Sequence, residues 1–162
     1  METAKDVMTR EVVTIRPDEP IRAMIERIRE TSYSGLPVVD AQGRAVGLVS
    51  QNDVLRAITF VQGAGQLLET FQVGKRQAAV ALLEAVREKR QAIAVHDFLE
   101  RPVREIMSAH LVGCAPDTPL TEVCHAMVEG HVHRVVVLED GKVIGLVSAT
   151  DLVRELGALL AG

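Results

Sequence analysis

The stretch that decides the fold reads Gly47-Leu48-Val49-Ser50-Gln51-Asn52-Asp53, and it returns as Gly145-Leu146-Val147-Ser148-Ala149-Thr150-Asp151. The two copies stand about 98 residues apart, and the similarity extends upstream of both. Asp6-Val7-Met8-Thr9 corresponds to Glu105-Ile106-Met107-Ser108. Across the two copies about 14 of roughly 50 aligned pairs are identical, and they occur in the same order. The chain therefore carries an internal duplication.

Each copy opens with a short amphipathic turn, a strand and a helix. The pattern predicts the strand at 12–15 in the first copy and at 111–114 in the second. Pro20 and Pro119 fit the first turn of the following helix, because the missing proline N–H costs nothing there. The apolar residues at helical spacing, which predict the buried face of that helix, are Ile21, Met24, Ile25, Ile28, Leu120, Val123, Cys124 and Met127.

Each copy closes with a hairpin and a second helix. Asp40-Ala41-Gln42-Gly43 and Glu139-Asp140-Gly141 are the Asp/Gly signals of tight turns between two apolar strands. The second helix is expected to begin at Gln51 and at Ala149. The sequence thus predicts an α/β fold built from two β-α-β-β-α repeats, at 1–58 and 104–162.

Residues 59–103 have no counterpart in either copy. Their apolar residues recur at helical spacing, and Gly74 is expected to break the pattern into two helices. We therefore expect a helical insert or linker between the repeats.

The composition is that of a folded, soluble protein. Of 162 residues 48% are apolar and 25% charged, with a net charge of −4. One Tyr, three Phe and no Trp offer little surface for base stacking, and the acidic balance argues against nucleic-acid binding. The longest apolar run, 78–83, is too short to span a membrane, and no secretory signal is found. With two cysteines, we expect a reduced cytoplasmic protein.

The ordered set of motifs, present twice, resembles the cystathionine-β-synthase (CBS) domain, and two such repeats in one chain resemble a Bateman module. The resemblance covers roughly residues 1–58 and 104–160. It implies two repeats packed about a pseudo-twofold axis, with two clefts that hold adenosine-containing ligands such as AMP, ADP, ATP or S-adenosylmethionine. It also implies a regulatory, energy-sensing role and a homodimer.

The Ser-x-x-Asp element has two interpretations that the sequence leaves open. Ser50 with Asp53, and Ser148 with Asp151, form the pattern of a capping box at a helix start. The same carboxylate can accept two hydrogen bonds from a ribose diol, and the N–H groups of the helix start can face a phosphate. The resemblance implies the ribose role for both aspartates.

A bound phosphate needs cationic partners, and the two copies differ at this point. His133-Arg134 resembles the His-Arg pair with which the γ subunits of AMP-activated kinase reach phosphates. The first repeat has Ser34-Gly35 at the matching positions. The alternative is a solvated arginine and a neutral surface histidine. From the resemblance we expect His133 and Arg134 to contact phosphate.

The resemblance also implies that the first strand of one repeat completes the cleft of the other. It assigns 14–16 to the cleft of Asp151 and 113–115 to the cleft of Asp53, where backbone amides and apolar side chains can hold adenine. Ordinary core packing is the alternative for the apolar members of these segments. The expected ligand residues are Thr14, Ile15, Arg16, Ser50, Asp53, Gly113, Cys114, His133, Arg134, Ser148, Thr150 and Asp151.

No motif indicates catalysis or a metal centre. G-x-S-x-G, Walker A and G-x-G-x-x-G are absent, and Cys114 would need a paired base to act as a nucleophile. Four of the five histidines fall between 110 and 133, without the spacing of zinc ligands. We expect a protein that is not an enzyme, whose adenine nucleotide is a regulatory ligand. The alternative is an oligomerisation or docking module with empty or vestigial clefts and an unidentified regulated protein as partner.

Overall fold

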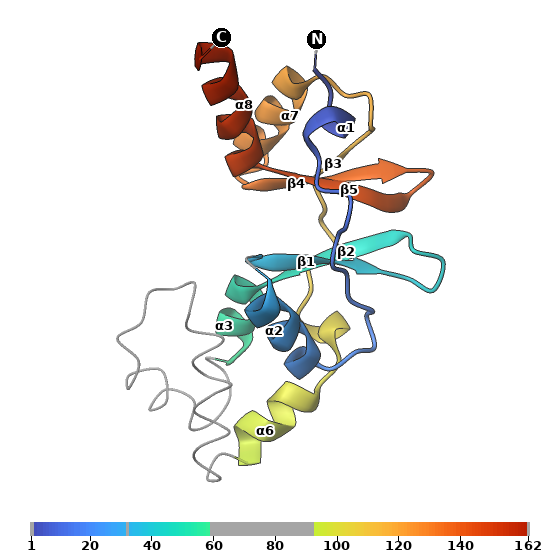
Figure 1. Cartoon of the computed structure of the whole chain (residues 1–162). Coiled ribbons are helices and arrows are strands. Elements are labelled where there is room, and N and C mark those ends of the chain that lie inside the picture. The colour runs from blue at the N-terminus through green and yellow to red at the C-terminus, as the bar shows by residue number, and fades with distance from the viewer. Residues whose placement is uncertain (1, 32, 59–92, 162) are drawn as a thin grey trace. The chain divides into compact units, whose positions relative to one another are not determined.

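A computed structural model describes residues 2–31, 33–58 and 93–161 of the chain (Figure 1). The predicted insert falls mostly outside these residues. The described elements of the first half are α1 (Ala4–Val7), α2 (Ile21–Glu30), β1 (Gly35–Val39), β2 (Ala45–Ser50) and α3 (Gln51–Ile58). Those of the second half are α6 (Ile93–Glu100), the 3-10 helix η1 (Val103–Glu105), β3 (Gly113–Cys114), α7 (Leu120–Glu129), β4 (Arg134–Glu139), β5 (Lys142–Ser148) and α8 (Ala149–Ala161).

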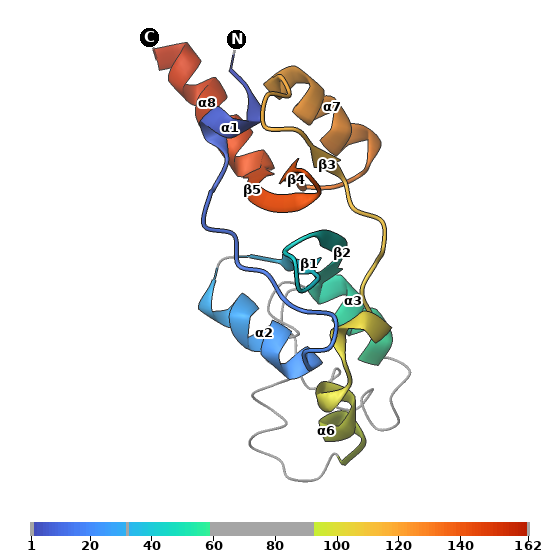
Figure 2. The ribbon, with the colours of Figure 1, turned by 90° about the vertical axis from the view of Figure 1, so that its right-hand side faces the viewer.

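The strands form two small sheets. In one sheet β1 pairs with β2, and in the other β3 runs parallel to β4, which is antiparallel to β5. Helices α1, α7 and α8 all lie on one face of the β3–β4–β5 sheet (Figures 1 and 2). This arrangement confirms the predicted α/β fold with two repeats.

The described residues divide into two compact units, and the division does not follow the chain order. What we term the second-repeat unit combines 2–13, 39–46 and 110–161. The first-repeat unit combines 14–31, 33–38, 47–58 and 93–109. The N-terminal turn of each repeat therefore belongs to the unit of the other repeat. The sequence boundaries 1–58, 59–103 and 104–162 remain predictions.

Backbone hydrogen bonds fix this exchange of N-terminal turns. In the second-repeat unit, the N–H of Ala4 donates to the Thr118 carbonyl at 2.9 Å, and Thr9 and Leu146 exchange bonds of 2.9 and 3.0 Å. In the first-repeat unit, Ser108 and Leu48 exchange bonds of 2.8 and 2.9 Å. The two contacts are equivalent by the duplication, so the exchange is a property of the repeat itself.

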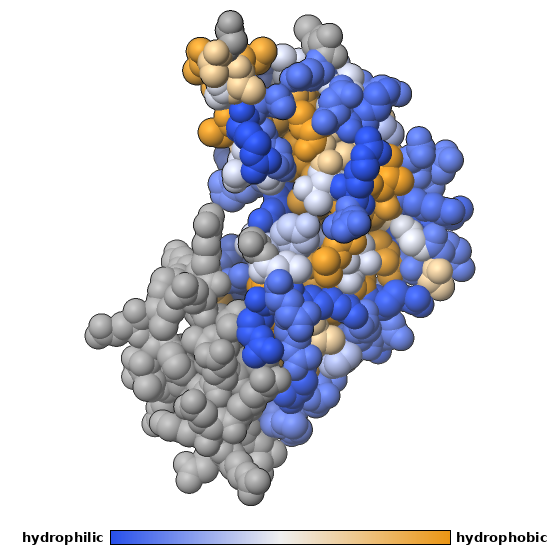
Figure 3. Space-filling view, in the orientation of Figure 1, coloured by the Kyte–Doolittle hydropathy of each residue, from blue (hydrophilic) through white to orange (hydrophobic). Residues whose placement is uncertain are grey.

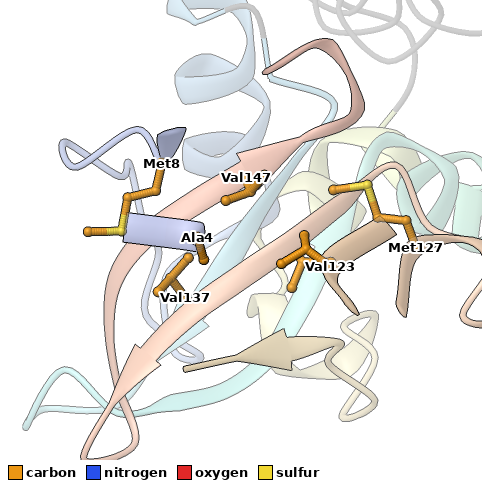
Figure 4. Packing of buried hydrophobic residues seen from close by; sticks show 7 residues of the cluster. Ala4, Met8, Val123, Met127, Val137 and Val147 are labelled. Carbon is orange, nitrogen blue, oxygen red and sulfur yellow. The ribbon is translucent and has the colours of Figure 1, made fainter. Parts of the chain in front are cut away.

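The core of the second-repeat unit uses residues from both ends of the chain (Figure 4). Ala4 and Met8 of the N-terminal turn pack with residues of α7, β4 and β5, which are Val123, Met127, Val135, Val137 and Val147. All seven residues are buried. The N-terminal turn is therefore part of the core and not a detachable extension.

The helices largely confirm the apolar spacing in the sequence. All four predicted positions of α2 are buried, and α3 and α8 begin at the expected residues. In α7 the prediction holds for Val123 and Met127, Leu120 is half-buried, and the prediction is wrong for Cys124, which is exposed. The two prolines occupy the N-cap position, one residue before the predicted first turn.

The first strand of each repeat is shorter than predicted. Residues 12–15 form no strand, and only Ile15 makes an isolated parallel bridge, to Val38. The Thr14 carbonyl accepts a hydrogen bond of 3.2 Å from the Arg27 guanidinium instead of a ladder partner. In the second repeat the strand is limited to β3, since pairing with β4 covers only two residues.

The two hairpins show why the turn residues were informative. Asp140 and Gly141 both have positive φ, 51° and 77°, and they connect Glu139 directly to its partner Lys142. Two such residues are the signature of a type I′ turn. In the longer first turn, Gly43 has φ 78°, and the Asp40 carboxylate accepts hydrogen bonds from two backbone N–H groups of the turn at 2.9 Å each.

No helix among the described residues is long and apolar enough to cross a membrane.

Candidate functional site

Each repeat presents a serine and an aspartate where its last strand ends and its last helix begins. The Ser50 N–H and hydroxyl both donate to Oδ2 of Asp53, each at 2.7 Å. In the second repeat the Ser148 N–H and hydroxyl donate to Oδ2 of Asp151 at 2.8 and 2.6 Å. The capping box expected from the sequence is therefore formed twice with the same geometry.

The second carboxylate oxygen has a different role from the first. Oδ1 of Asp53 accepts from Arg56 at 3.1 Å, and Oδ1 of Asp151 accepts from Arg154 at 3.1 Å. The aspartate side chains are 14% exposed, whereas the arginines are 77% and 73% exposed. Exposed ion pairs of this kind contribute little to stability. Among the described residues, Oδ1 of each aspartate accepts its hydrogen bond from a solvated arginine, and a ligand hydroxyl can compete for it.

Each serine has as neighbours the side chains of the strand that pairs with its own strand. In the second repeat the Ala149 N–H donates to the His133 carbonyl at 2.9 Å, and Arg134 lies directly opposite Ser148 in the sheet. Side chains at opposite positions have Cβ atoms about 5 Å apart. The structure therefore brings Arg134 next to Ser148 within one unit, while Thr150 is exposed in the first turn of α8.

The first repeat repeats this backbone contact without a basic side chain. The Gln51 N–H donates to the Ser34 carbonyl at 2.9 Å. At Gly35 an added Cβ would lie 2.9 Å from the Val49 carbonyl oxygen and 3.2 Å from the Ser50 Cβ. The position that holds Arg134 in the second repeat thus has no room for a side chain in the first. This steric restriction explains why the first repeat has Gly35 where the second has an arginine.

A hollow of about 390 Å³ lies beside Asp53 in the first-repeat unit. Its lining residues are Asp53, Arg56, Ala57, Glu105, Ile106, Met107 and Ser108. Residues 105–108 were not among the binding residues expected from the sequence. The sequence feature that could have indicated them is the alignment of 105–108 with 6–9, which served only to define the repeat.

The segments expected to form the cleft walls are fixed within their own units. Ile15 is buried and its N–H donates to the Pro37 carbonyl at 3.1 Å. The Glu19 carboxylate accepts the Arg16 N–H at 2.8 Å and forms an ion pair with Arg27 at 2.6 Å. The structure groups Thr14, Ile15 and Arg16 with Asp53 in the first-repeat unit.

The corresponding segment of the second repeat lies in the second-repeat unit. Gly113 and Cys114 form β3 beside β4, in the same unit as Asp151. Burial raises the pKa of the Cys114 thiol, so this sulfur is held in its neutral form at neutral pH. The combination of each segment with the aspartate of the other repeat remains a prediction.

Comparison with known proteins identifies the repeated unit. The family model of the CBS domain matches residues 4–59 and 103–158, which is more than half of the chain. The chain belongs to the CBS-domain family. Both Ser-x-x-Asp elements fall inside the matched CBS regions.

Similar proteins align with the whole CBS pair. An uncharacterized protein, MJ1426, of Methanocaldococcus jannaschii is 26% identical over 161 residues, covering 94% of this chain and 89% of that protein. The solved CBS domain pair of protein MJ0100, in complex with 5′-methylthioadenosine and S-adenosyl-L-methionine, has a TM-score of 0.69 at 19% identity and covers 98% of each chain. The structure of CBSX2 in complex with AMP has a TM-score of 0.69 at 20% identity, also over 98% of each chain. These likenesses establish the fold of a CBS domain pair.

Proposed function

We propose that this CBS domain pair is a regulatory module that binds an adenosine-containing ligand, with Asp53 and Asp151 as the ribose receptors. The proposal rests on the duplicated Ser-x-x-Asp element, Ser50 with Asp53 and Ser148 with Asp151, which we term the Ser-x-x-Asp seat. In both copies one carboxylate oxygen is fixed by the serine, and the other accepts, within the part of the chain that the structure describes, from an exposed arginine. A carboxylate that is fixed in position, and at which a ligand hydroxyl can replace the arginine on one oxygen, is suited to accept hydrogen bonds from a diol.

The surroundings of the seats fit the rest of such a ligand. Arg134 lies opposite Ser148 in the sheet, so its guanidinium, with its fork of donors, can bind the phosphate of a ligand held at this serine. The hollow beside Asp53 has a volume within the range of small-molecule sites, about 300–1,000 Å³. The AMP, 5′-methylthioadenosine and S-adenosylmethionine of the two similar structures share adenine and ribose. This shared part is what the duplicated seat would recognise.

The proposal is one of binding without catalysis. A cytoplasmic protein that senses the level of AMP, ADP, ATP or S-adenosylmethionine would pass ligand occupancy to a regulated partner. Among the described residues, no group of three or more His, Cys, Asp or Glu side chains is placed to hold a metal ion. The alternative, a docking module with vestigial clefts, predicts that none of these ligands stabilises the protein.

A thermal-shift panel separates the two functions. Ligands that bind the native state raise the melting temperature by mass action, with about 2.7 kcal/mol of stabilisation at a hundredfold excess over Kd. We expect at least one of AMP, ADP, ATP and S-adenosylmethionine to raise the melting temperature, and ribose 5-phosphate and GMP to do so far less. A panel with no shift at millimolar ligand would contradict the binding function and favour the docking alternative.

A further inference from the structure

The two Ser-x-x-Asp seats have the same backbone geometry at the start of the helix. In the first repeat the Gln51 N–H donates to the Ser34 carbonyl at 2.9 Å. In the second repeat the Ala149 N–H donates to the His133 carbonyl, also at 2.9 Å. The aspartate N–H donates to the serine hydroxyl at 3.4 Å in the first-repeat seat and at 3.3 Å in the second-repeat seat. A difference between the ligands that the two seats select therefore has to come from the surrounding side chains.

The residue beside the serine is the first such difference. In the second-repeat seat Arg134 is the partner of Ser148 across β4 and β5, and its guanidinium is a fixed fork of donors for phosphate oxygens. In the first-repeat seat the matching residue is Gly35, where an added Cβ would lie 2.9 Å from the Val49 carbonyl oxygen. Because a backbone oxygen cannot move aside like the end of a flexible side chain, β1 cannot present a cation at this position.

The hollow beside the first-repeat seat has an apolar wall. Its volume is about 390 Å³, and Ala57, Ile106 and the half-buried Met107 are among the residues that line it. The matching positions of the second repeat differ, because Met8 is buried in the core and Glu155 stands in place of Ala57. The first-repeat seat therefore offers apolar contacts to an uncharged part of a ligand.

The charged groups that line the same hollow disfavour a phosphate. Asp53 and Glu105 contribute two carboxylates, and Arg56 contributes one guanidinium. Arg56 pairs with Asp53 at 3.1 Å, and Glu105 accepts a hydrogen bond from Nε of Arg101 at 2.5 Å. A phosphate in the hollow would have to compete with a carboxylate for either guanidinium, and it would lie beside the negative charge of Glu105.

The exposed apolar surface of the second-repeat unit has a different character from this hollow. Figure 3 shows it at the C-terminal end of α8, where Leu159 and Leu160 are 72% and 82% exposed. Side chains that project so far into solvent do not form the walls of a pocket, in which a small ligand would lose most of its exposed surface. The hollow of the first repeat, and not this end of α8, is therefore the apolar surface that bears on ligand selection.

We propose that the two seats select different ligands. The first-repeat seat takes an adenine nucleoside without a phosphate, and the second-repeat seat takes an adenine nucleotide. Because both aspartates are taken as receptors of a ribose diol, this selection rests on the proposed function. The ion pairs of Arg56 and Arg154 are common to both seats, so the selection comes from Arg134 in one seat and from Gly35 and the hollow in the other. One chain would then respond to two ligands that differ only in the phosphate.

Variants that keep one seat test the selection, with adenosine and AMP as the probes. Asp151→Asn leaves the first-repeat seat intact, and Asp53→Asn leaves the second-repeat seat intact. In titration calorimetry on the full chain, Asp151→Asn should bind adenosine about tenfold more tightly than AMP, and Asp53→Asn should show the reverse preference of about tenfold, as one charged hydrogen bond gives. The wild type, which needs no substitution, should still bind AMP when adenosine saturates the first-repeat seat.

Glu105→Gln in the Asp151→Asn background tests the role of the hollow. It removes a carboxylate from the lining and releases Arg101 from its ion pair, so AMP binding should strengthen about fivefold while adenosine binding is unchanged. A damaged fold cannot give this gain. Glu100→Gln is the matched control, because Glu100 also pairs with an arginine, Arg22, but lies outside the lining of the hollow. It should leave both affinities unchanged.

The outcomes distinguish this selection from the proposed function. The same order of AMP and adenosine affinities in Asp53→Asn and Asp151→Asn would overturn the selection and leave the proposed function standing. So would a wild type in which saturating adenosine prevents all binding of AMP. A wild type that binds neither adenosine nor AMP would overturn the proposed function and the selection together.

Discussion

Asp53 and Asp151 each use one carboxylate oxygen to hold a helix start and leave the other to an exposed arginine. The two interpretations of the Ser-x-x-Asp motif, cap and ribose receptor, therefore concern different oxygen atoms of one side chain. The cap accounts for the fixed position of the carboxylate. A fixed carboxylate loses little rotamer freedom when a ligand binds, so the structural role supports the proposed binding role.

Arg134 is the residue at which we expect the phosphate of the ligand to be recognised. Arg134→Ala should weaken binding of AMP by about 1.5 to 3 kcal/mol, the range for hydrogen bonds to charged groups. Adenosine, which has no phosphate, should bind the variant and the wild type equally well. Titration calorimetry with both ligands measures the difference. Equal losses for adenosine and AMP would mean that Arg134 supports the fold and not the phosphate.

The sequence was sufficient to predict the seats but not their surroundings. The Ser-x-x-Asp pattern is local, and its geometry follows from a strand that ends where a helix begins. The proximity of Arg134 to Ser148 depends on the register between β4 and β5, and the position of 105–108 beside Asp53 depends on contacts between distant segments. Neither register nor long-range contact is encoded in local spacing.

At the scale of elements, periodicity predicted the long helices well and the short strands poorly. Ten-residue helices such as α2 display nearly three turns of apolar spacing. The apolar run at 12–15 has the composition of a strand, but the Thr14 carbonyl is bound by Arg27 and the ladder does not form. Contacts with distant residues, and not the local β preference alone, therefore decide where the strand forms.

Gly47 marks a close approach between β2 and residues 107–108 at the start of the second repeat. A Cβ at this position would clash with the Ser108 carbonyl oxygen, which is held in place because it accepts a hydrogen bond from the Leu48 N–H. Gly47→Ala should therefore lower the free energy of unfolding by about 1 to 3 kcal/mol, as overpacking does. Urea denaturation measures the change.

Gly145 provides the matched comparison in the second repeat. A Cβ there would meet side-chain atoms of the buried Met8, from its Cβ to its sulfur, and not a backbone oxygen, and an unbranched side chain can adjust more readily than a hydrogen-bonded backbone. Gly145→Ala should accordingly be less destabilising than Gly47→Ala. The reverse order of the two urea midpoints would contradict the described contact between Ser108 and β2.

The Glu19–Arg27 pair gives the first-repeat unit a dependence on pH. The hydrogen bond and charge of Arg27 hold the pKa of Glu19 below its usual value of about 4.3. The unfolded chain then binds more protons than the folded one in acid, so this contribution is full above the unfolded pKa and is lost as the pH falls through the lower, folded pKa.

Glu19→Gln should therefore be destabilised at neutral pH, and its stability should fall less steeply than that of the wild type as the pH falls from about 6 to 3. Urea midpoints measured along this range test the sign. Asp18→Asn is the control, because Asp18 is the exposed neighbour of Glu19. Parallel pH profiles for wild type and Glu19→Gln would show that the ion pair contributes no pH dependence.

At the scale of the whole molecule, the duplication in the sequence predicted the architecture of two α/β repeats. It did not predict that the N-terminal turns are exchanged between the repeats. Alignment of 6–9 with 105–108 shows that both copies contain the turn, but not which copy it packs on. Burial of Ala4 and Met8 beside α7 settles this, since the N-terminal turn completes the core of the second-repeat unit. The exchange ties the stability of each repeat to the presence of the other.

The proposed function rests on recognition of a ribose diol by two equivalent carboxylates. Titration calorimetry of AMP and of 2′-deoxy-AMP, with the wild type and with Asp53→Asn/Asp151→Asn, tests this most directly. Asn preserves the shape of the side chain and removes the charge. Asp40→Asn, at the opposite end of β2 from Ser50, is the control for the same chemical change.

We predict that the wild type and Asp40→Asn bind AMP more tightly than 2′-deoxy-AMP. The double variant should lose about 1 to 3 kcal/mol of AMP binding and with it most of the preference for the diol. Binding of AMP that is equal in wild type and double variant, or a wild type that does not distinguish AMP from 2′-deoxy-AMP, would contradict the account.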